Sequence, residues 1–227
     1  MGEKRVSKRK FIEKARVLKM NPGKFISIEG IEGVGKSTNI KFIASLIEKH
    51  DHNVMVTREP GGTIMAEKIR SLLLQHENEH LPDIAELLLF FAARSFHVNN
   101  LIKKSLEDGV WVVCDRFSDA TKAYQGWGRG LNIDMINDLS EWVNDGLQPH
   151  LTLILDAPVD IALERTQKRK DKDRMESEAS SFFENVRAGY LELASKEPDR
   201  CCVINAAQSI KKVQNDINEA MKPIFLI

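Results

Sequence analysis

Residues 24–37 read KFISIEGIEGVGKS, and this stretch decides the fold. The apolar run Lys24–Glu29 is followed at once by Gly30–Ser37, which has the pattern G-x-x-x-x-G-K-S. Apolar residues then recur at helical spacing to about Lys49. A buried strand that passes through a glycine-rich turn into a helix is typical of a phosphate-binding unit in parallel α/β proteins. The stretch therefore predicts the first strand, loop and helix of such a sheet.

The rest of the chain repeats the alternation of apolar strand and amphipathic helix. Further strands are predicted at residues 53–57, 110–114, 151–155 and 201–204, and helices at residues 63–75, 81–106 and 132–144. Asn132 is expected to cap the last of these helices. Strands that are apolar throughout indicate a parallel sheet covered on both faces, because right-handed crossovers place helices on each side. We therefore predict an α/β fold of the P-loop NTPase class, a doubly wound five-stranded parallel sheet flanked by helices.

The overall composition is that of an ordinary globular protein. Hydrophobic residues make up 42% of the 227 residues, and 33 basic side chains balance 33 acidic ones, so nothing indicates a nucleic-acid or membrane partner. No apolar run approaches the roughly 18 residues of a membrane span. Cys114, Cys201 and Cys202 are odd in number and lack zinc-like spacing. Because they make a poor disulfide framework, a reducing cytoplasm is the expected location.

The amino terminus differs from the rest in charge. We expect residues 1–23 to be a basic extension, in which lysines and arginines outnumber Glu3 and Glu13, and residues 24–227 to be the folded domain. No apolar segment of the secretory type follows the basic residues. A basic arm for nucleic acid and a presequence both remain open. The favoured interpretation is a frayed extension, or an upstream start codon with Met20 as the true start.

The glycine-rich loop has the composition needed to hold the phosphates of ATP. Its glycines allow backbone N–H groups to turn inward, Lys36 is expected to reach the β- and γ-phosphates, and the Ser37 hydroxyl to bind Mg²⁺. No Asn-Lys-x-Asp element for guanine occurs, and no apolar strand ends in Asp-Glu as in many motor ATPases. The residues expected to contact ATP are Gly30, Ile31, Glu32, Gly33, Val34, Gly35, Lys36, Ser37 and Thr38.

Four further segments follow the loop in a fixed order. They are Arg58–Gly62 (REPGG), Leu89–Arg94 (LFFAAR), Asp115–Phe117 (DRF) and Ala123–Gly130 (AYQGWGRG). With the loop, they make residues 24–220 resemble the thymidylate kinase family of bacterial type, and the first and last segments are the most specific. The resemblance implies an ATP- and Mg²⁺-dependent nucleoside monophosphate kinase domain that phosphorylates dTMP to dTDP for dTTP biosynthesis. It also implies a homodimer formed through helices such as residues 81–106.

The resemblance implies a role for each residue around the nucleoside. Phe90 would stack on the thymine ring, and Arg94 would bind the edge of the base. Thr121 would lie near the thymine, and Tyr124 would lie against the sugar and crowd out a 2′-hydroxyl. Gln125 would lie near the nucleoside.

The resemblance also implies a phosphate end of the site. Arg58 and Arg116 would hold the acceptor phosphate, for which a forked guanidinium is well suited. Glu32 would face the sugar and phosphate of the acceptor. Asp115 ends a strand beside the glycine loop and would hold Mg²⁺ through water.

A charged segment, Arg165–Glu176, matches the position of a short lid. The resemblance implies that family members with glycine at the position of Gly33, where others carry arginine, supply the catalytic arginine from the lid. Arg165, Arg169 and Arg174 match lid arginines, and Arg169 is the favoured candidate. Together with Lys36 and Arg116, they would neutralise charge on the transferred phosphoryl group.

Two other functions remain open at this stage. One is the same chemistry on a different nucleotide, and the other is a non-catalytic regulator that binds nucleotide with the same fold. Discrimination between dTMP and dUMP depends on one methyl group and cannot be derived from residue types.

Overall fold

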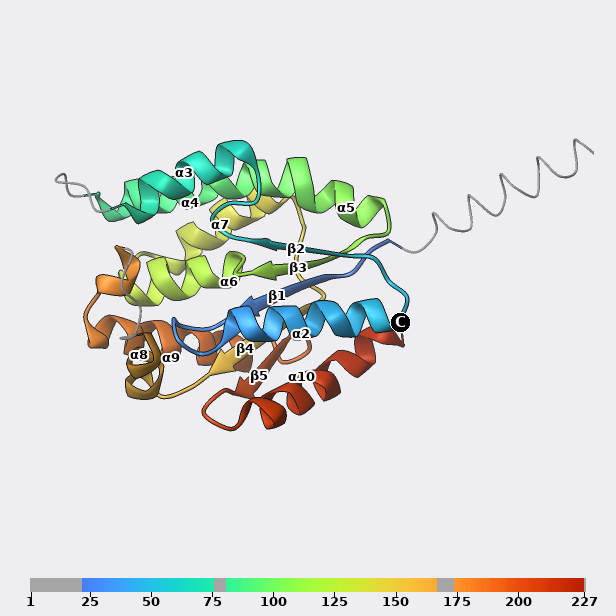
Figure 1. Ribbon diagram of the computed structural model, residues 1–227. Helices are drawn as coiled ribbons and strands as arrows, with labels where there is room; N and C mark the ends of the chain where they lie inside the picture. Colours follow the sequence, from blue (N-terminus) through green and yellow to red (C-terminus); the bar gives the residue numbers. More distant parts are fainter. Residues whose placement is uncertain (1–21, 76–80, 167–173, 227) are drawn as a thin grey trace, which may run out of the picture.

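Figure 1 shows the computed structural model, which describes residues 22–75, 81–166 and 174–226. A five-stranded parallel sheet in the order β2-β3-β1-β4-β5 forms its centre, as predicted. The strands are β1 (Phe25–Glu29), β2 (Val54–Arg58), β3 (Trp111–Asp115), β4 (Leu151–Asp156) and β5 (Cys201–Asn205). Their arrowheads point to the same end of the molecule, where parallel α/β proteins bind their ligands.

Helices cover both faces of this sheet. Helices α2 and α10 pack on one face, whereas α5 and α9 pack on the other. The helices are α2 (Lys36–Lys49), α3 (Ile64–Leu74), α4 (Asp83–His97), α5 (Lys103–Glu107), α6 (Ser118–Thr121), α7 (Ile133–Asn144), α8 (Val159–Thr166), α9 (Ser180–Lys196) and α10 (Ile210–Phe225). Two π-helical turns, η1 (Val98–Ile102) and η2 (Lys122–Gly128), and a 3₁₀ turn, η3 (Met175–Ser177), complete the described elements.

The middle strand, β1, is buried along its whole length, including its two polar side chains. Ser27 lies opposite Thr152 of β4, and the two hydroxyl oxygens are 2.9 Å apart, so each satisfies the other inside the sheet. The carboxyl group of Glu29 is fully buried at the end of the strand. This end leads directly into the glycine loop, which is therefore anchored to the central, fully buried strand of the sheet.

The edges of the sheet differ from the prediction of strands that are apolar and covered throughout. Val56 of β2 is 50% exposed and Val203 of β5 is 42% exposed. Both strands lie at the sheet edge, where the flanking helices cover only part of the faces. The burial expected from a uniformly apolar run therefore holds for the inner strands alone.

The helix predicted at residues 81–106 is one helical run with an internal change of period. It consists of α4, the π-helical turn η1 and α5. The cap predicted at Asn132 is confirmed, because its Oδ1 accepts the Met135 N–H at 3.0 Å at the start of α7. Thr63, the first residue of the helix predicted at residues 63–75, caps α3. None of the described helices is both long and apolar enough to cross a membrane. All three cysteines are free thiols.

Candidate active site

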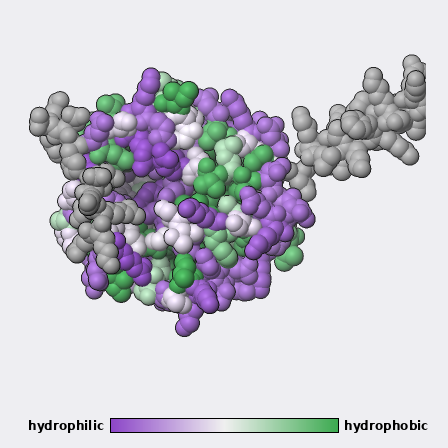
Figure 2. All heavy atoms as spheres, in the orientation of Figure 1, coloured by the Kyte–Doolittle hydropathy of each residue, from purple (hydrophilic) through white to green (hydrophobic). Residues whose placement is uncertain are grey.

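Two adjoining cavities lie at the carboxyl ends of the strands. The glycine-loop cavity, of ≈ 280 Å³, is lined by Gly33, Gly35, Lys36, Ser37, Thr38, Arg58, Asp115 and Arg165, among others. The aromatic cavity is lined by Phe90, Arg94, Phe117, Thr121, Tyr124 and Gln125, among others. Glu32, Glu59, Arg70 and Arg116 line both. In Figure 2, hydrophilic residues surround a hollow on the side to which the strand arrowheads of Figure 1 point.

The glycine loop joins β1 to α2 in a conformation that requires glycine. Gly30, Gly33 and Gly35 all have positive φ angles, of 124°, 79° and 92°. A Cβ atom on Gly33 would also lie 2.0 Å from the carbonyl oxygen of Ala162 in α8. The side chains of Ile31 and Val34 are buried in the core, so these two residues can offer a ligand only their backbone.

Lys36 turns back over this loop. Its ammonium group donates to the carbonyl oxygens of Gly30 and Ile31, both at 2.9 Å. Burial and the neighbouring Arg116 lower the pKa of Lys36 to about 8. Because phosphate oxygens are stronger acceptors for an ammonium group than neutral carbonyls, a bound polyphosphate would complete the environment of this cation.

The residues at the end of β3 fit a magnesium ion. Asp115 lines the glycine-loop cavity with Ser37, and its buried Oδ1 has no hydrogen-bond partner among the described residues. Carboxylate and hydroxyl oxygens are hard ligands of the kind that Mg²⁺ prefers. No group of three or more His, Cys, Asp or Glu side chains that could hold a metal occurs in the described part of the chain. That is compatible with Mg²⁺, which takes few protein ligands and binds phosphates and water as well.

Arg116 connects the two cavities. Its guanidinium donates to Glu32 at 2.8 Å, to the Gly30 carbonyl at 2.9 Å and to the Tyr190 hydroxyl at 3.1 Å. It also lies over the ring of Tyr124, whose hydroxyl donates to Glu32. Burial alone would raise the pKa of Glu32, but Arg116 and Lys36 hold it below its ordinary value. Glu32 is therefore a carboxylate that fixes both Arg116 and Tyr124 at the boundary between the cavities.

Arg94 forms the deep polar end of the aromatic cavity. It is 2% exposed, and it donates through Nε to Glu59 at 2.7 Å and through Nη2 to Thr121 at 2.8 Å. Its Nη1 has no partner within the described part of the chain. Phe90 lies half-buried one helical turn before it on α4. A flat ring with an acceptor on its edge would satisfy the unpaired nitrogen while it stacks on the phenyl group.

Comparison with known proteins identifies the family to which this site belongs. The thymidylate kinase family profile matches residues 28–217. Thymidylate kinase from Teredinibacter turnerae is 50% identical over 200 residues, which is 88% of this chain and 98% of that protein. Thymidylate kinase from Methylococcus capsulatus is 50% identical over 198 residues, which is 87% of this chain and 94% of the relative. This chain belongs to the thymidylate kinase family.

The structural comparison agrees. The crystal structure of thymidylate kinase from Ehrlichia chaffeensis superimposes with a TM-score of 0.71 at 36% identity, covering 88% of this chain and 99% of that one. The resemblance stated from the sequence motifs, and with it the P-loop fold and the class of enzyme, a nucleoside monophosphate kinase, are thus confirmed. The roles of single residues are not tested by these comparisons and stay predictions.

The lid arginines lie in different places. Arg165, in the last turn of α8, lines the glycine-loop cavity and donates to the Ala206 carbonyl at 3.1 Å. Arg174 is a lining residue of neither cavity, because its guanidinium is bound to Glu86 and to the Leu73 carbonyl. Arg169, the favoured candidate, lies outside the described residues. The geometry therefore favours Arg165 over Arg174 as a group that can reach a nucleotide in this family member.

Two residues that the sequence did not single out, Arg70 and Glu59, line both cavities, and a third, Glu86, supports the lining residue Gln125. Arg70 of α3 lines both cavities and donates to the Pro60 carbonyl at 2.7 Å. Glu59 holds Arg94 and His97, which keep its pKa low although burial alone would raise it. Glu86 accepts from the amide of Gln125 at 2.8 Å and from Arg174. Glu59 could have been predicted, because it is the charged residue within the specific motif Arg-Glu-Pro-Gly-Gly. Arg70 and Glu86 lie in ordinary amphipathic helices, whose sequence does not distinguish them from surface residues.

Arg58 is the least buried of the arginines predicted to bind phosphate. Its guanidinium pairs with Glu67 at 2.9 Å, and the side chain is 52% exposed. It lines the glycine-loop cavity and does not line the aromatic one. A bound phosphate would have to compete with Glu67 for this guanidinium, so its contribution depends on a rearrangement that Arg116 does not need.

Proposed function

We propose that this chain transfers the γ-phosphoryl group of ATP to dTMP and releases ADP and dTDP, a step toward dTTP. The observation that carries the proposal is the position of Arg116, which lines the glycine-loop cavity and the aromatic cavity at once. A monophosphate whose base lies against Phe90 and Arg94 would direct its phosphate to Arg116. ATP on the glycine loop would present its γ-phosphate to the same guanidinium from the other side.

The chemistry follows from this juxtaposition. An oxygen of the dTMP phosphate attacks the γ-phosphorus of ATP, the new P–O bond forms, and the bond to the β-phosphate oxygen breaks in line with it. No general base is required, because the second pKa of a phosphate monoester is about 6 and the attacking oxygen is already ionised at neutral pH. Lys36 and Arg116 neutralise the charge on the transferred group, and Arg165, Arg169 and Arg174 are the further candidates from the lid.

Ser37 and Asp115 would hold Mg²⁺, with Asp115 acting through water. The ion would neutralise part of the negative charge on the ATP phosphates. The remaining predicted contacts bind and orient the acceptor: Arg58, Phe90, Arg94, Thr121, Tyr124, Gln125 and Glu32. Of these, Tyr124 is fixed by its hydrogen bond to Glu32, which supports its proposed role beside the sugar.

ADP formation with ATP–Mg²⁺ against dTMP, dUMP, UMP, CMP, AMP and GMP tests the proposal. We expect strong preference for dTMP and a loss of about 10²–10³-fold or more in rate in Lys36→Ala. Preference for another nucleotide would contradict the assignment of the aromatic cavity to thymine, whereas the assignment as a nucleoside monophosphate kinase would stand. ATP binding without acceptor-dependent ADP formation would overturn the proposal of catalysis and favour a regulator that binds nucleotide.

We further propose that the chain forms a homodimer in the cytoplasm. Support comes from α4, on which Ile84, Leu88 and Phe96 are exposed at intervals of four and eight residues, so that they share one helical face. Exposed apolar side chains of α3 and α7 add to the set: Ile64, Met65, Leu72 and Trp142. Exposed apolar residues gathered on neighbouring helices are typical of a surface that a second subunit covers.

A further inference from the structure

The carboxyl group of Glu29 has no role among those implied for the nucleotide site. It is the last residue of β1, it is fully buried, and it lines neither cavity. Both of its oxygens are nevertheless in use. Oε1 accepts the backbone N–H of Phe117 at 2.7 Å, and Oε2 accepts the hydroxyl of Tyr190 at 2.8 Å. Burying a carboxyl group costs free energy even when it is hydrogen-bonded. The two contacts therefore indicate that Glu29 has a specific role in this part of the fold.

Both hydrogen bonds lead to Arg116. Phe117 follows Arg116 in the chain, and the Arg116 backbone is in the left-handed region with a φ of 70°, which is unfavourable for a residue with a side chain. The Tyr190 hydroxyl, which donates to Glu29, accepts from Arg116 Nη1 at 3.1 Å. One oxygen of Glu29 therefore holds the strained backbone next to Arg116, and the other holds its guanidinium through Tyr190.

We propose that Glu29 is a positioning residue, which fixes Arg116 from beneath the site in the orientation that binds the acceptor phosphate. The inference rests on the proposed function. The ionised carboxylate is the form that completes the network, because both oxygens then accept and Tyr190 is free to accept from Arg116. When Glu29 is protonated, its own O–H points toward Tyr190, and the tyrosine proton has no acceptor among these atoms. The hydrogen bonds that orient Arg116 are therefore stronger when Glu29 is ionised.

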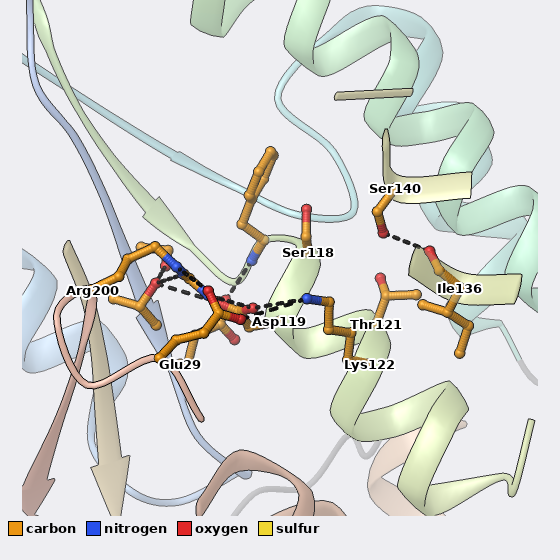
Figure 3. A network of polar contacts seen from close by, with 12 residues as sticks. Glu29, Ser118, Asp119, Thr121, Lys122, Ile136, Ser140 and Arg200 are labelled. Carbon is orange, nitrogen blue, oxygen red and sulfur yellow. Dashed lines mark hydrogen bonds and ion pairs between the residues drawn. The ribbon is translucent and has the colours of Figure 1, made fainter. Parts of the chain in front are cut away.

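The surroundings of Glu29 set the pH at which this happens. Burial and the negative charge of Asp119 raise the pKa of Glu29 to about 8, although Arg116 opposes them. Figure 3 shows Glu29 close to Asp119, which is itself paired with Arg200 and Lys122. The titratable and charged groups that act on Glu29 or are acted on by it come from every neighbouring element: Lys36, Cys114, Arg116, Asp119, Tyr190 and Cys201.

The test compares wild type with Glu29→Gln, Tyr190→Phe and the double variant, measuring kcat and KM for dTMP and for ATP from pH 6.5 to 9.5. Glutamine keeps the shape and the acceptor for Phe117 but stays neutral, as the protonated acid does. We expect Glu29→Gln to lie within about threefold of wild type at pH 6.5 and to fall about 10-fold or more below it in kcat/KM for dTMP at pH 9. KM for ATP at pH 6.5 should change by less than about twofold, because the glycine loop is unaltered and Lys36, whose pKa is about 8, stays protonated at that pH.

Two further comparisons separate positioning from a loss of folding. The double variant should be no worse than Tyr190→Phe alone, because both substitutions interrupt one chain of contacts. Ser140→Ala removes a buried hydroxyl that donates only to the Ile136 carbonyl within α7 and is the matched control. Its kinetics should equal those of wild type at every pH.

A ratio of kcat/KM for dTMP, wild type over Glu29→Gln, that does not change with pH would overturn the proposal. Equal losses of kcat/KM toward ATP and dTMP would also overturn it, as would additive effects of the two substitutions in the double variant. Calorimetric titration with dTMP at pH 6.5 and 9 makes the outcome independent of turnover. If wild type binds dTMP but does not phosphorylate it, the proposed function fails, and the pH dependence of the affinity ratio still decides the role of Glu29. Equal pH dependence of dTMP affinity in the two proteins would overturn that role.

Discussion

At the scale of single residues, the proton on Glu29 links the site to stability. Its pKa in the folded protein is about 8, against an ordinary value of 4.5 that applies once the chain unfolds. Between these two values the folded protein keeps a proton that the unfolded chain has lost. The contribution of Glu29 to stability is therefore fully present below about pH 4.5 and declines as the pH rises to about 8. The fold therefore loses this contribution while Glu29 of the folded protein still keeps its proton, and the ionisation that tightens the site follows near pH 8.

This gives a prediction for unfolding. The difference in the free energy of unfolding, Glu29→Gln minus wild type, should increase steadily from pH 5 to pH 8 and level off above it, because glutamine cannot titrate. Urea unfolding at each pH measures it. A difference that does not change over this range would show that Glu29 keeps an ordinary pKa in the folded protein.

Arg94 is the residue at which motif and structure complement each other most clearly. The motif Leu89–Arg94 predicted the residue, since an arginine one turn after a phenylalanine pair matches the family pattern. It could not predict Glu59 as its partner, nor the unpaired Nη1, because these depend on the packing of β2, α4 and α6. The sequence thus supplies the chemical type of the contact, and the fold supplies its direction.

Arg94→Lys tests this geometry. A lysine donates from a single nitrogen and cannot reproduce the separate Nε, Nη1 and Nη2 donors that Arg94 directs to Glu59, the base edge and Thr121, so KM for dTMP should rise about 10-fold or more with little change in KM for ATP. Arg187→Lys is the matched control, because Arg187 pairs bidentately with Asp156 and lines neither cavity. If the two variants behave alike in steady-state kinetics, Arg94 does not contact the base.

At the scale of secondary structure, predictability follows distance along the chain. The unit of β1, glycine loop and α2 is local, so its spacing alone predicted it. The helix capped by Asn132 was also predicted, because the capping oxygen and the Met135 N–H that donates to it are three residues apart. Glu86 could not be anticipated: it joins α4 to η2 through Gln125 and to the chain before η3 through Arg174, which lies 88 positions away. An acid in an amphipathic helix gives no indication that it will be buried.

Removing that charge should loosen three elements at once. Glu86→Gln should lower the free energy of unfolding by about 1–3 kcal/mol, because Arg129 and Arg174 lose a buried charged acceptor. Thermal and denaturant unfolding measure the effect. Glu219→Gln is the control, since it removes an exposed carboxylate paired with Lys222 and should change little. Equal free energies of unfolding of the two variants would mean that the buried contacts of Glu86 do not stabilise the fold.

At the scale of the whole molecule, the family identity was predictable from motifs in a fixed order, and the homodimer that the resemblance implied through helices such as residues 81–106 stays a prediction. The net charge of zero gives no information on whether a second copy of the chain binds. The exposed apolar side chains can be identified only once the helices are packed on the sheet. Ile84, Leu88 and Phe96 would each pass for core residues of α4 in sequence, yet they face outward. The outward face is a property of the assembled fold.

The homodimer can be tested on this face. Leu88→Glu puts a charge at the centre of the exposed row on α4 and should convert a dimer to a monomer in sedimentation velocity. Ile210→Glu, on the exposed start of α10, is a control of similar exposure that should leave the mass unchanged. A monomeric wild type, or a Leu88→Glu variant that stays dimeric, would contradict the predicted interface.

The close approach of Gly33 to Ala162 restricts how this enzyme can evolve. An arginine at position 33 would require α8 to shift away from the loop, because even one carbon atom there meets the Ala162 carbonyl. Yet α8 carries Arg165 and leads into the segment with the other candidate arginines. On the proposed role of these arginines, a substitution that brings an arginine into the loop would move Arg165 away from the glycine-loop cavity in the same change. A change from one source of the arginine to the other would then need substitutions in both the loop and α8.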